Sequence, residues 1–151
     1  MNRIQTIRSM KIHIFVFLAL ILVQFWLGMT INLEVALPIL SYGGISALIY
    51  YATHFWPVLA HIIIAITILI ISARFVLLSL RVQSGPLLVL GIIGVAAILG
   101  AIYNGVSFLL SRQFFGNSIG MAMSAVSSVV VYGLALYYIG AISTENAAPR
   151  I

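Results

Sequence analysis

The chain has 151 residues, of which 64% are hydrophobic and only 6% are charged, and its formal net charge is +5. Because a soluble domain carries about a quarter charged residues, this composition excludes an ordinary water-soluble fold. It also argues against nucleic-acid binding, which requires a basic patch on a soluble surface. The chain has no cysteine, so disulfides, thiolate metal sites and cysteine nucleophiles are excluded.

The first apolar stretch runs from Ile12 to Ile31 and follows Arg3, Arg8 and Lys11. A helix that crosses a bilayer needs about 20 mostly apolar residues at a rise of 1.5 Å each, and this stretch meets that length. The apolar core of a signal peptide is only about 7–15 residues long. We therefore expect a retained membrane helix rather than a cleaved signal peptide.

The next segment, Asn32–His54, is the one long connection between apolar stretches. Pro38 ends or kinks a helix, and Gly43-Gly44 favours a turn. The remaining residues are mostly apolar and aromatic, which is unusual for a loop in water. We expect this outer loop to lie at the membrane interface or to fold back over the mouth of the bundle.

Three further apolar stretches follow, each long enough to cross a bilayer: Phe55–Leu80, Pro86–Leu110 and Asn117–Ile139. The links between them are short, which predicts antiparallel neighbours. The predicted fold is all-α, a four-helix transmembrane bundle in which residues 1–151 form a single integral membrane domain. We expect a multi-pass protein of the cell (plasma) membrane.

The basic residues indicate the orientation of this bundle. If both termini are cytoplasmic, Arg112 is the one Lys or Arg residue on the outer side, and the inner side holds Arg3, Arg8, Lys11, Arg74, Arg81 and Arg150. Positive residues collect on the cytoplasmic side of membrane proteins. The sequence therefore predicts an N-in/C-in topology, in which Arg74 extends its long side chain toward the inner headgroups.

Small residues recur at helical spacing in the third and fourth apolar stretches. They are Gly94, Ala97, Ala101 and Gly105 in the third, and Gly120, Ser124 and Ser128 in the fourth. Burial of apolar side chains does not drive helices together in lipid, whereas small residues let two backbones approach closely. We interpret these residues as a helix-packing surface, and the alternative is a translocation path with the same lining.

Four polar side chains have similar expected depths in the outer half of the membrane, one on each span: Gln24, His61, Asn104 and Ser124. Polar groups inside a membrane are costly and are often functional. One interpretation is a hydrogen-bonded layer that fixes the register of the helices. The other is a small ligand-binding pocket for a quinone head group, an ion or another polar ligand.

The histidines His13, His54 and His61 raise the question of haem, which histidine can ligate. The spacing of His54 and His61 predicts one face of the second span, about 10 Å apart along it. His13 lies toward the opposite side of the membrane, so the depths argue against two axial histidines within one copy, and His61 is the axial candidate that remains. No metal site is predicted, because the carboxylates Glu34 and Glu145 lie outside the spans.

Several short motifs are distinctive, and the most specific is Tyr103-Asn104-Gly105-Val106-Ser107-Phe108-Leu109. Others are Gln24-Phe25, Leu27-Gly28-Met29 with Asn32-Leu33, Pro38 and His61. Together these motifs resemble an uncharacterised family of small four-helix membrane proteins in bacteria and archaea. The resemblance extends over nearly the whole chain. It implies a four-helix membrane fold without a particular activity, and it adds weight to His13, Gln24, His61 and Asn104.

These features favour a non-enzymatic integral membrane protein, namely a structural or accessory subunit of a membrane assembly. Its expected partners are the lipid bilayer and either a second copy of the chain or other membrane subunits. No catalytic residue and no cofactor is predicted. One alternative is a haem- or quinone-binding electron-transfer subunit that uses His61, with Gln24 and Asn104 as supports. The other is a small dimeric transporter or channel.

Overall fold

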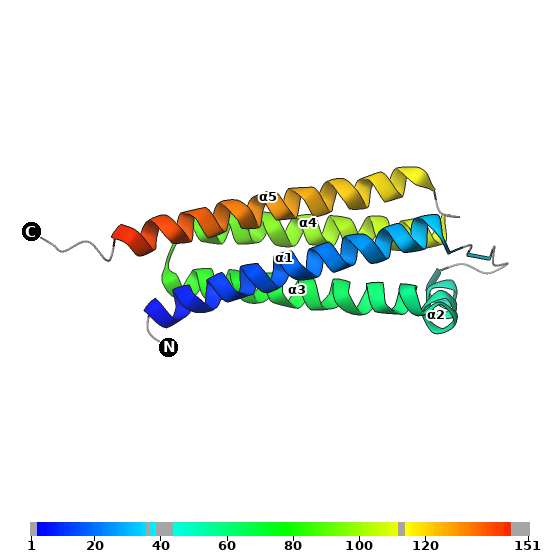
Figure 1. Ribbon diagram of the computed structural model, residues 1–151, viewed down its shortest axis with the longest axis horizontal. Coiled ribbons are helices and arrows are strands. Elements are labelled where there is room, and N and C mark those ends of the chain that lie inside the picture. Colours follow the sequence, from blue (N-terminus) through cyan, green and yellow to red (C-terminus); the bar gives the residue numbers. More distant parts are fainter. Residues whose placement is uncertain (1–2, 36, 39–43, 112–113, 146–151) are drawn as a thin grey trace, which may run out of the picture.

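The computed structural model describes residues 3–35, 37–38, 44–111 and 114–145, and the regular structure in them is helical throughout. In chain order the helices are α1 (Arg3–Leu33), α2 (Gly44–His54), α3 (Trp56–Val82), α4 (Gly85–Leu110) and α5 (Phe115–Glu145). The four long helices lie side by side, and the short α2 lies at one end of them (Figure 1). The predicted all-α bundle is confirmed.

Each long helix packs on the next one in chain order, and α1 also packs on α5, so the four helices surround a common core. Helix α1 begins and helix α5 ends at the same end of the bundle, opposite α2 (Figure 1). We call the half of the bundle nearer this end the terminal half, and the half nearer α2 the α2 half. The α2 half is the one that the sequence predicts to face outward.

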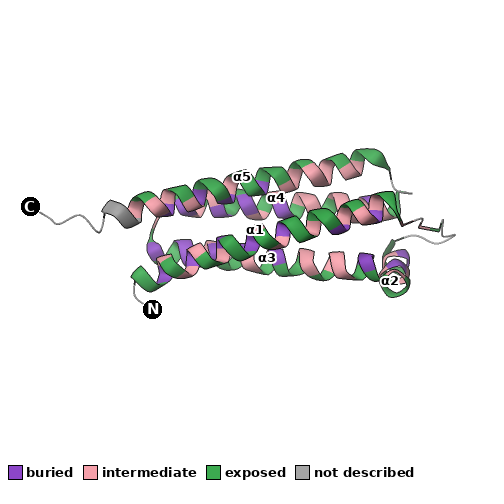
Figure 2. Ribbon diagram, in the orientation of Figure 1, coloured by how far each residue is buried: buried purple, intermediate pink, exposed green. Residues whose placement is uncertain are grey.

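Each long helix has an apolar segment of sufficient length to cross a membrane, so the chain is a multi-pass membrane protein. The helices extend beyond the predicted apolar stretches, since α1 begins at Arg3 and α5 continues to Glu145. Large apolar side chains such as Leu22, Ile70 and Leu134 are more than half exposed. Exposed residues recur along the length of the long helices (Figure 2), as expected of a surface that contacts lipid.

The connection predicted at residues 32–54 contains helix α2. It begins at Gly44, whose φ of 68° is a conformation that glycine adopts without strain. Figure 1 shows α2 nearly end-on, so it runs across the end of the bundle. The hydroxyl of the buried Tyr51 donates a hydrogen bond to the carbonyl oxygen of Pro38 over 2.8 Å. This bond ties α2 to the segment that follows α1.

A short turn makes α3 and α4 antiparallel neighbours. Gln83 adopts a left-handed conformation with φ of 55°, and its N–H donates to the carbonyl oxygen of Leu80 over 3.1 Å. Pro86 occupies the first turn of α4, where backbone N–H groups have no acceptor within the helix, so the N–H that proline lacks costs no hydrogen bond. The turn therefore ends α3 at Val82 and starts α4 at Gly85.

Tyr132 of α5 is the centre of the terminal half and is only 1% exposed. The centroid of its ring lies 4.1 Å from that of Phe17 on α1 and 5.3 Å from that of Phe75 on α3. The ring also rests on Gly94 of α4, where an added Cβ atom would come within 2.7 Å of it. One side chain thus contacts all three of the other long helices. Its hydroxyl interacts with that of Ser72, although neither makes a hydrogen bond of standard geometry.

Burial along α5 differs between its two ends. Ser128, Tyr132, Ala135 and Ile139 are buried at helical spacing in the terminal half. From Phe115 to Ser127, in contrast, every residue is at least partly exposed. The helices therefore pack tightly in the terminal half and leave space between them in the α2 half.

Candidate functional site

A cavity of about 370 Å³ occupies the space between the long helices in the α2 half. All four long helices contribute to its lining, and Leu48 of α2 lines it as well. Most of the lining is apolar, and the polar side chains in it are Gln24, Asn32, His61 and Ser118. Small-molecule sites in proteins have this volume and this character, a largely apolar surface with a few polar groups.

The ring of His61 lies against α1 at one particular turn. An added Cβ atom on Gly28 would lie 3.3 Å from Cε1 of this ring. The ring also interacts with the backbone of Gln24, one helical turn earlier. The absence of a side chain at Gly28 therefore lets α3 place an imidazole directly on α1.

Two side-chain polar atoms, one on α1 and one on α3, make no hydrogen bond of standard geometry with the described residues. They are Oε1 of Gln24 and Nδ1 of His61, and both are buried. A buried polar atom without a partner costs about 1–3 kcal/mol. Both residues line the cavity.

Three exposed side chains also line the cavity: Phe25 (48% exposed) and Met29 (47%) of α1, and Ile66 (52%) of α3. In a membrane, the exposed surface of a spanning helix faces lipid. The cavity therefore has a side that opens toward the bilayer, and a lipophilic molecule could enter it without crossing water.

Asn104 and Ser124 were predicted to share a layer with Gln24 and His61, but they are not among the residues that line the cavity. Nδ2 of Asn104 donates a hydrogen bond to Gly100 of its own helix over 2.8 Å. Its amide rests on Gly120 of α5, while Oγ of Ser124 lies 3.3 Å from the position of a Cβ atom on Gly100. The four polar residues thus form one pair between α1 and α3 and another between α4 and α5.

The small residues of α4 and α5 lie at close approaches between these two helices. Gly94 faces Tyr132, and Gly105 lies against the sulfur of Met121, 3.2 Å from an added Cβ atom. Ser128 is fully buried, and its hydroxyl donates to the carbonyl oxygen of Ala125 over 2.7 Å. Ala97 is half-buried on α4. Ala101 is half-buried too and lines the cavity.

The other two histidines lie away from the cavity. Nδ1 of His13 is 2.7 Å from the carbonyl oxygen of Ser9, and the ring of His54 stacks on Tyr50 with centroids 4.1 Å apart. The prediction that His54 and His61 share one face of a helix is wrong, because α2 ends at His54 and α3 begins at Trp56. Among the described residues, no three His, Asp or Glu side chains are grouped to hold a metal ion.

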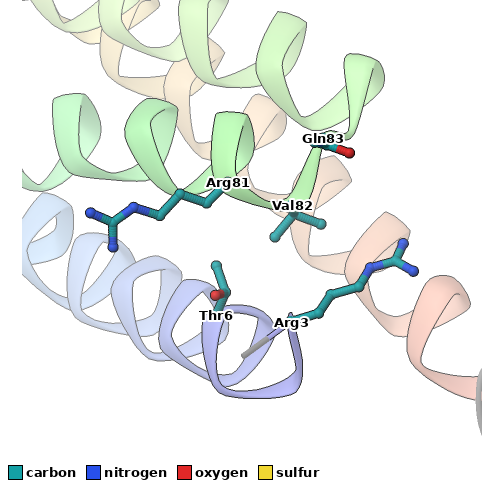
Figure 3. A pocket seen from close by; sticks show the side chains of 5 residues that line it. All are labelled: Arg3, Thr6, Arg81, Val82 and Gln83. Carbon is teal, nitrogen blue, oxygen red and sulfur yellow. The ribbon is translucent and has the colours of Figure 1, made fainter. Parts of the chain in front are cut away.

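A second, open hollow lies at the terminal end, between the first turns of α1 and the end of α3. It is lined by Arg3, Thr6, Arg81, Val82 and Gln83. The guanidinium groups of Arg3 and Arg81 point in opposite directions (Figure 3), so their charges do not converge on one point. This hollow lacks the geometry of an anion-binding site.

The site predicted from the sequence left out most of the cavity lining, including Gly28, Asn32 and Ser118. Gln24, Gly28 and Asn32 follow one another at intervals of four residues, which places them on one helix face. That spacing was a usable signal.

Comparison with protein-family models, with curated proteins and with solved structures gives no match, so the site is interpreted from its own geometry.

Proposed function

We propose that this protein binds a small lipophilic molecule in the cavity of its α2 half. The observation that supports the proposal is the pair of buried, unpaired polar atoms, Oε1 of Gln24 and Nδ1 of His61, in an otherwise apolar cavity. An apolar core does not need such groups, and they are costly to retain. A ligand with a polar head and an apolar body would satisfy them and fill the remaining space.

A quinone-like molecule fits this lining better than haem does. Haem has two propionates that call for basic partners, and none of the described side chains lining the cavity is basic. His61 is the one histidine among the described residues that line the cavity, and its ring is already packed against Gly28. We therefore expect the purified protein to be colourless. A Soret band that disappears in His61→Ala would contradict this expectation.

A transport path through a single copy is disfavoured by the terminal half. Tyr132, Phe17 and Phe75 fill the core on that side of the cavity, so a solute entering from the α2 end would meet packed aromatic rings. We propose instead a non-enzymatic accessory role, in which the chain holds its ligand for a larger membrane assembly or a second copy. Membership of the small four-helix family that its motifs resemble is part of this proposal.

Filling the cavity provides a direct test of ligand binding. Ala101 lines the cavity on α4, and Ala96 lies on the same helix with its side chain exposed. Wild type, Ala101→Leu and the control Ala96→Leu would be extracted in lipid-retaining nanodiscs, and the bound molecules identified by mass spectrometry. We expect one lipophilic molecule at near-equimolar amount in wild type and Ala96→Leu, and its loss in Ala101→Leu. Identical extracts from all three proteins would contradict the proposal.

The proposed orientation is N-in/C-in, in the cell membrane. Arg3, Arg8, Lys11, Arg74 and Arg81 all belong to the terminal half of α1 and α3, and positive charge favours the cytoplasmic side. Arg112 and Arg150 lie outside the described residues.

Since the chain has no cysteine, single-cysteine variants can report this topology. In intact cells, a membrane-impermeant maleimide should label Phe114→Cys at the α2 end. It should label Gln83→Cys, at the turn of the terminal end, only after the cells are permeabilised. The reverse labelling pattern would show the opposite orientation.

A further inference from the structure

We infer that the ligand of the α2-half cavity carries a hydroxyl head group, such as a phenol, a quinol or an alcohol, which pairs with Gln24 and His61 together. This inference rests on the proposed function, because it specifies the chemical class of the molecule that the cavity holds. It specifies the polar end of the ligand, which the volume of the cavity and its apolar lining do not determine.

The hydrogen-bonding capacities of the two unpaired atoms set the requirement. Oε1 of Gln24 is an amide oxygen and can only accept, so its partner must be a donor. Nδ1 of His61 donates or accepts according to the tautomer of the ring. A hydroxyl has one donor hydrogen and two acceptor lone pairs, so it can donate to Gln24 and accept from His61 at once. A carbonyl or an ether oxygen can only accept, so it could not pair with Oε1 of Gln24.

The positions of the two side chains suit a single head group. The ring of His61 contacts α1 at Gly28 and interacts with the backbone of Gln24, so it lies against the turn of α1 that carries Gln24. Both residues line one cavity. Ile21, Ile68 and Ile98 line it as well, which leaves an apolar environment for the body of the ligand.

The exposed side chains Phe25, Met29 and Ile66 lie along the same cavity. A molecule that enters from the lipid would slide its apolar body past them and bring its head to the α1–α3 contact. Inside, no water competes for the hydroxyl, so a correctly placed donor gains more than it would at the protein surface. The site should therefore discriminate strongly between ligands that differ only in this donor.

The inference can be tested with two probes that differ in one hydrogen-bond donor, 4-pentylphenol and its methyl ether 4-pentylanisole. Delipidated protein in nanodiscs would be melted in the presence of increasing amounts of each probe, because a ligand that binds the folded state raises the melting temperature. We expect the phenol to bind wild-type protein about tenfold more tightly than the ether. In the double variant Gln24→Met/His61→Phe, which removes both acceptors, the two probes should bind equally, and Gln24→Met alone should reduce the preference for the phenol.

The outcomes separate this inference from the proposed function. Equal binding of the two probes to wild type, abolished for both in Ala101→Leu, would overturn the hydroxyl inference and leave the cavity as a binding site. A phenol preference that is undiminished in Gln24→Met would also overturn it. If neither probe shifts the melting of wild type while Ala96→Leu and Ala101→Leu behave alike, the proposed function itself fails, and water is the simplest occupant of the cavity.

Discussion

The terminal half and the α2 half of the bundle use the same four helices in different ways. In the terminal half, one aromatic side chain, Tyr132, contacts α1, α3 and α4, and the buried residues of α5 recur at helical spacing. In the α2 half, the same helices separate around a cavity of about 370 Å³, and no described residue of α5 from Phe115 to Ser127 is buried. Because the same four long helices form both halves, the difference comes from the particular side chains at the contacts.

The comparison suggests a division of roles. A tightly packed half fixes how the helices meet, and this allows the other half to keep an open cavity without loss of the fold. Sites that break the ordinary rules of packing and hydrogen bonding in a stable protein are often functional. The predictions that follow test this division by making matched changes in the two halves.

The largest effect is expected at the centre of the terminal half. Replacing the buried Tyr132 by alanine removes the ring that packs on Phe17 and Phe75, and such truncations cost about 3–5 kcal/mol. Tyr137→Ala is the matched control, because Tyr137 lies on the same helix and is 79% exposed. Denaturation in detergent, followed by tryptophan fluorescence, should show a large loss of stability for the first variant and little change for the second. Similar losses for both would mean that Tyr132 is not the packing centre.

The same alanine-to-leucine change should have different effects in the two halves. Ala135 of α5 is fully buried in the terminal half, and extra methylenes in a filled core cost about 1–3 kcal/mol. Ala101 lines the cavity, so its added side chain enters free space and should raise stability by about 0.5–2 kcal/mol. Melting temperatures of Ala135→Leu and Ala101→Leu in the absence of ligand would measure both effects. A loss of stability in Ala101→Leu as large as in Ala135→Leu would indicate that the α2 half is already closely packed.

The fold class could be predicted from the sequence because the bilayer imposes its thickness on the apolar stretches. The end of α2 was harder to predict. Asn32–His54 was treated as a loop, and His54 was placed on the same helix as His61, whereas Phe55 is extended and separates α2 from α3. Pro57 was the available signal, because proline favours the first turn of a new helix.

The arrangement of the polar residues could be predicted only in part. Counting residues along a helix gives the depth of a side chain, but the direction in which it points depends on how each helix is rotated against its neighbours. For this reason four residues of similar expected depth, Gln24, His61, Asn104 and Ser124, occur as two separate pairs. Whether the first pair binds a ligand stays a prediction.

Two glycines allow a smaller comparison between the halves. A Cβ atom at Gly94 would come within 2.7 Å of the Tyr132 ring, which Phe17 and Phe75 hold in place, whereas one at Gly28 would lie 3.3 Å from a His61 ring with the cavity beside it. We expect Gly94→Ala to lose about 1–2 kcal/mol. In Gly28→Ala, a shift of the imidazole toward the cavity and the better helix propensity of alanine should keep the change within about 0.5 kcal/mol. Thermal melts of the two variants would measure both changes in stability. An equal loss for both would show that His61 is held as rigidly as Tyr132.

The smallest effect concerns single polar groups. Ser79 is buried in the terminal half, and its hydroxyl bonds to the carbonyl oxygens of Phe75 (2.9 Å) and Leu87 (3.3 Å), so Ser79→Ala should lose about 1 kcal/mol. Oε1 of Gln24 is buried without a partner, so Gln24→Met should instead gain about 1 kcal/mol in ligand-free protein. With ligand bound the sign should reverse, because the wild-type amide is then paired and methionine forfeits that bond. Melts of both variants with and without the extracted ligand would reveal this reversal, and a gain for Gln24→Met that is unchanged by ligand would mean that the amide plays no part in binding.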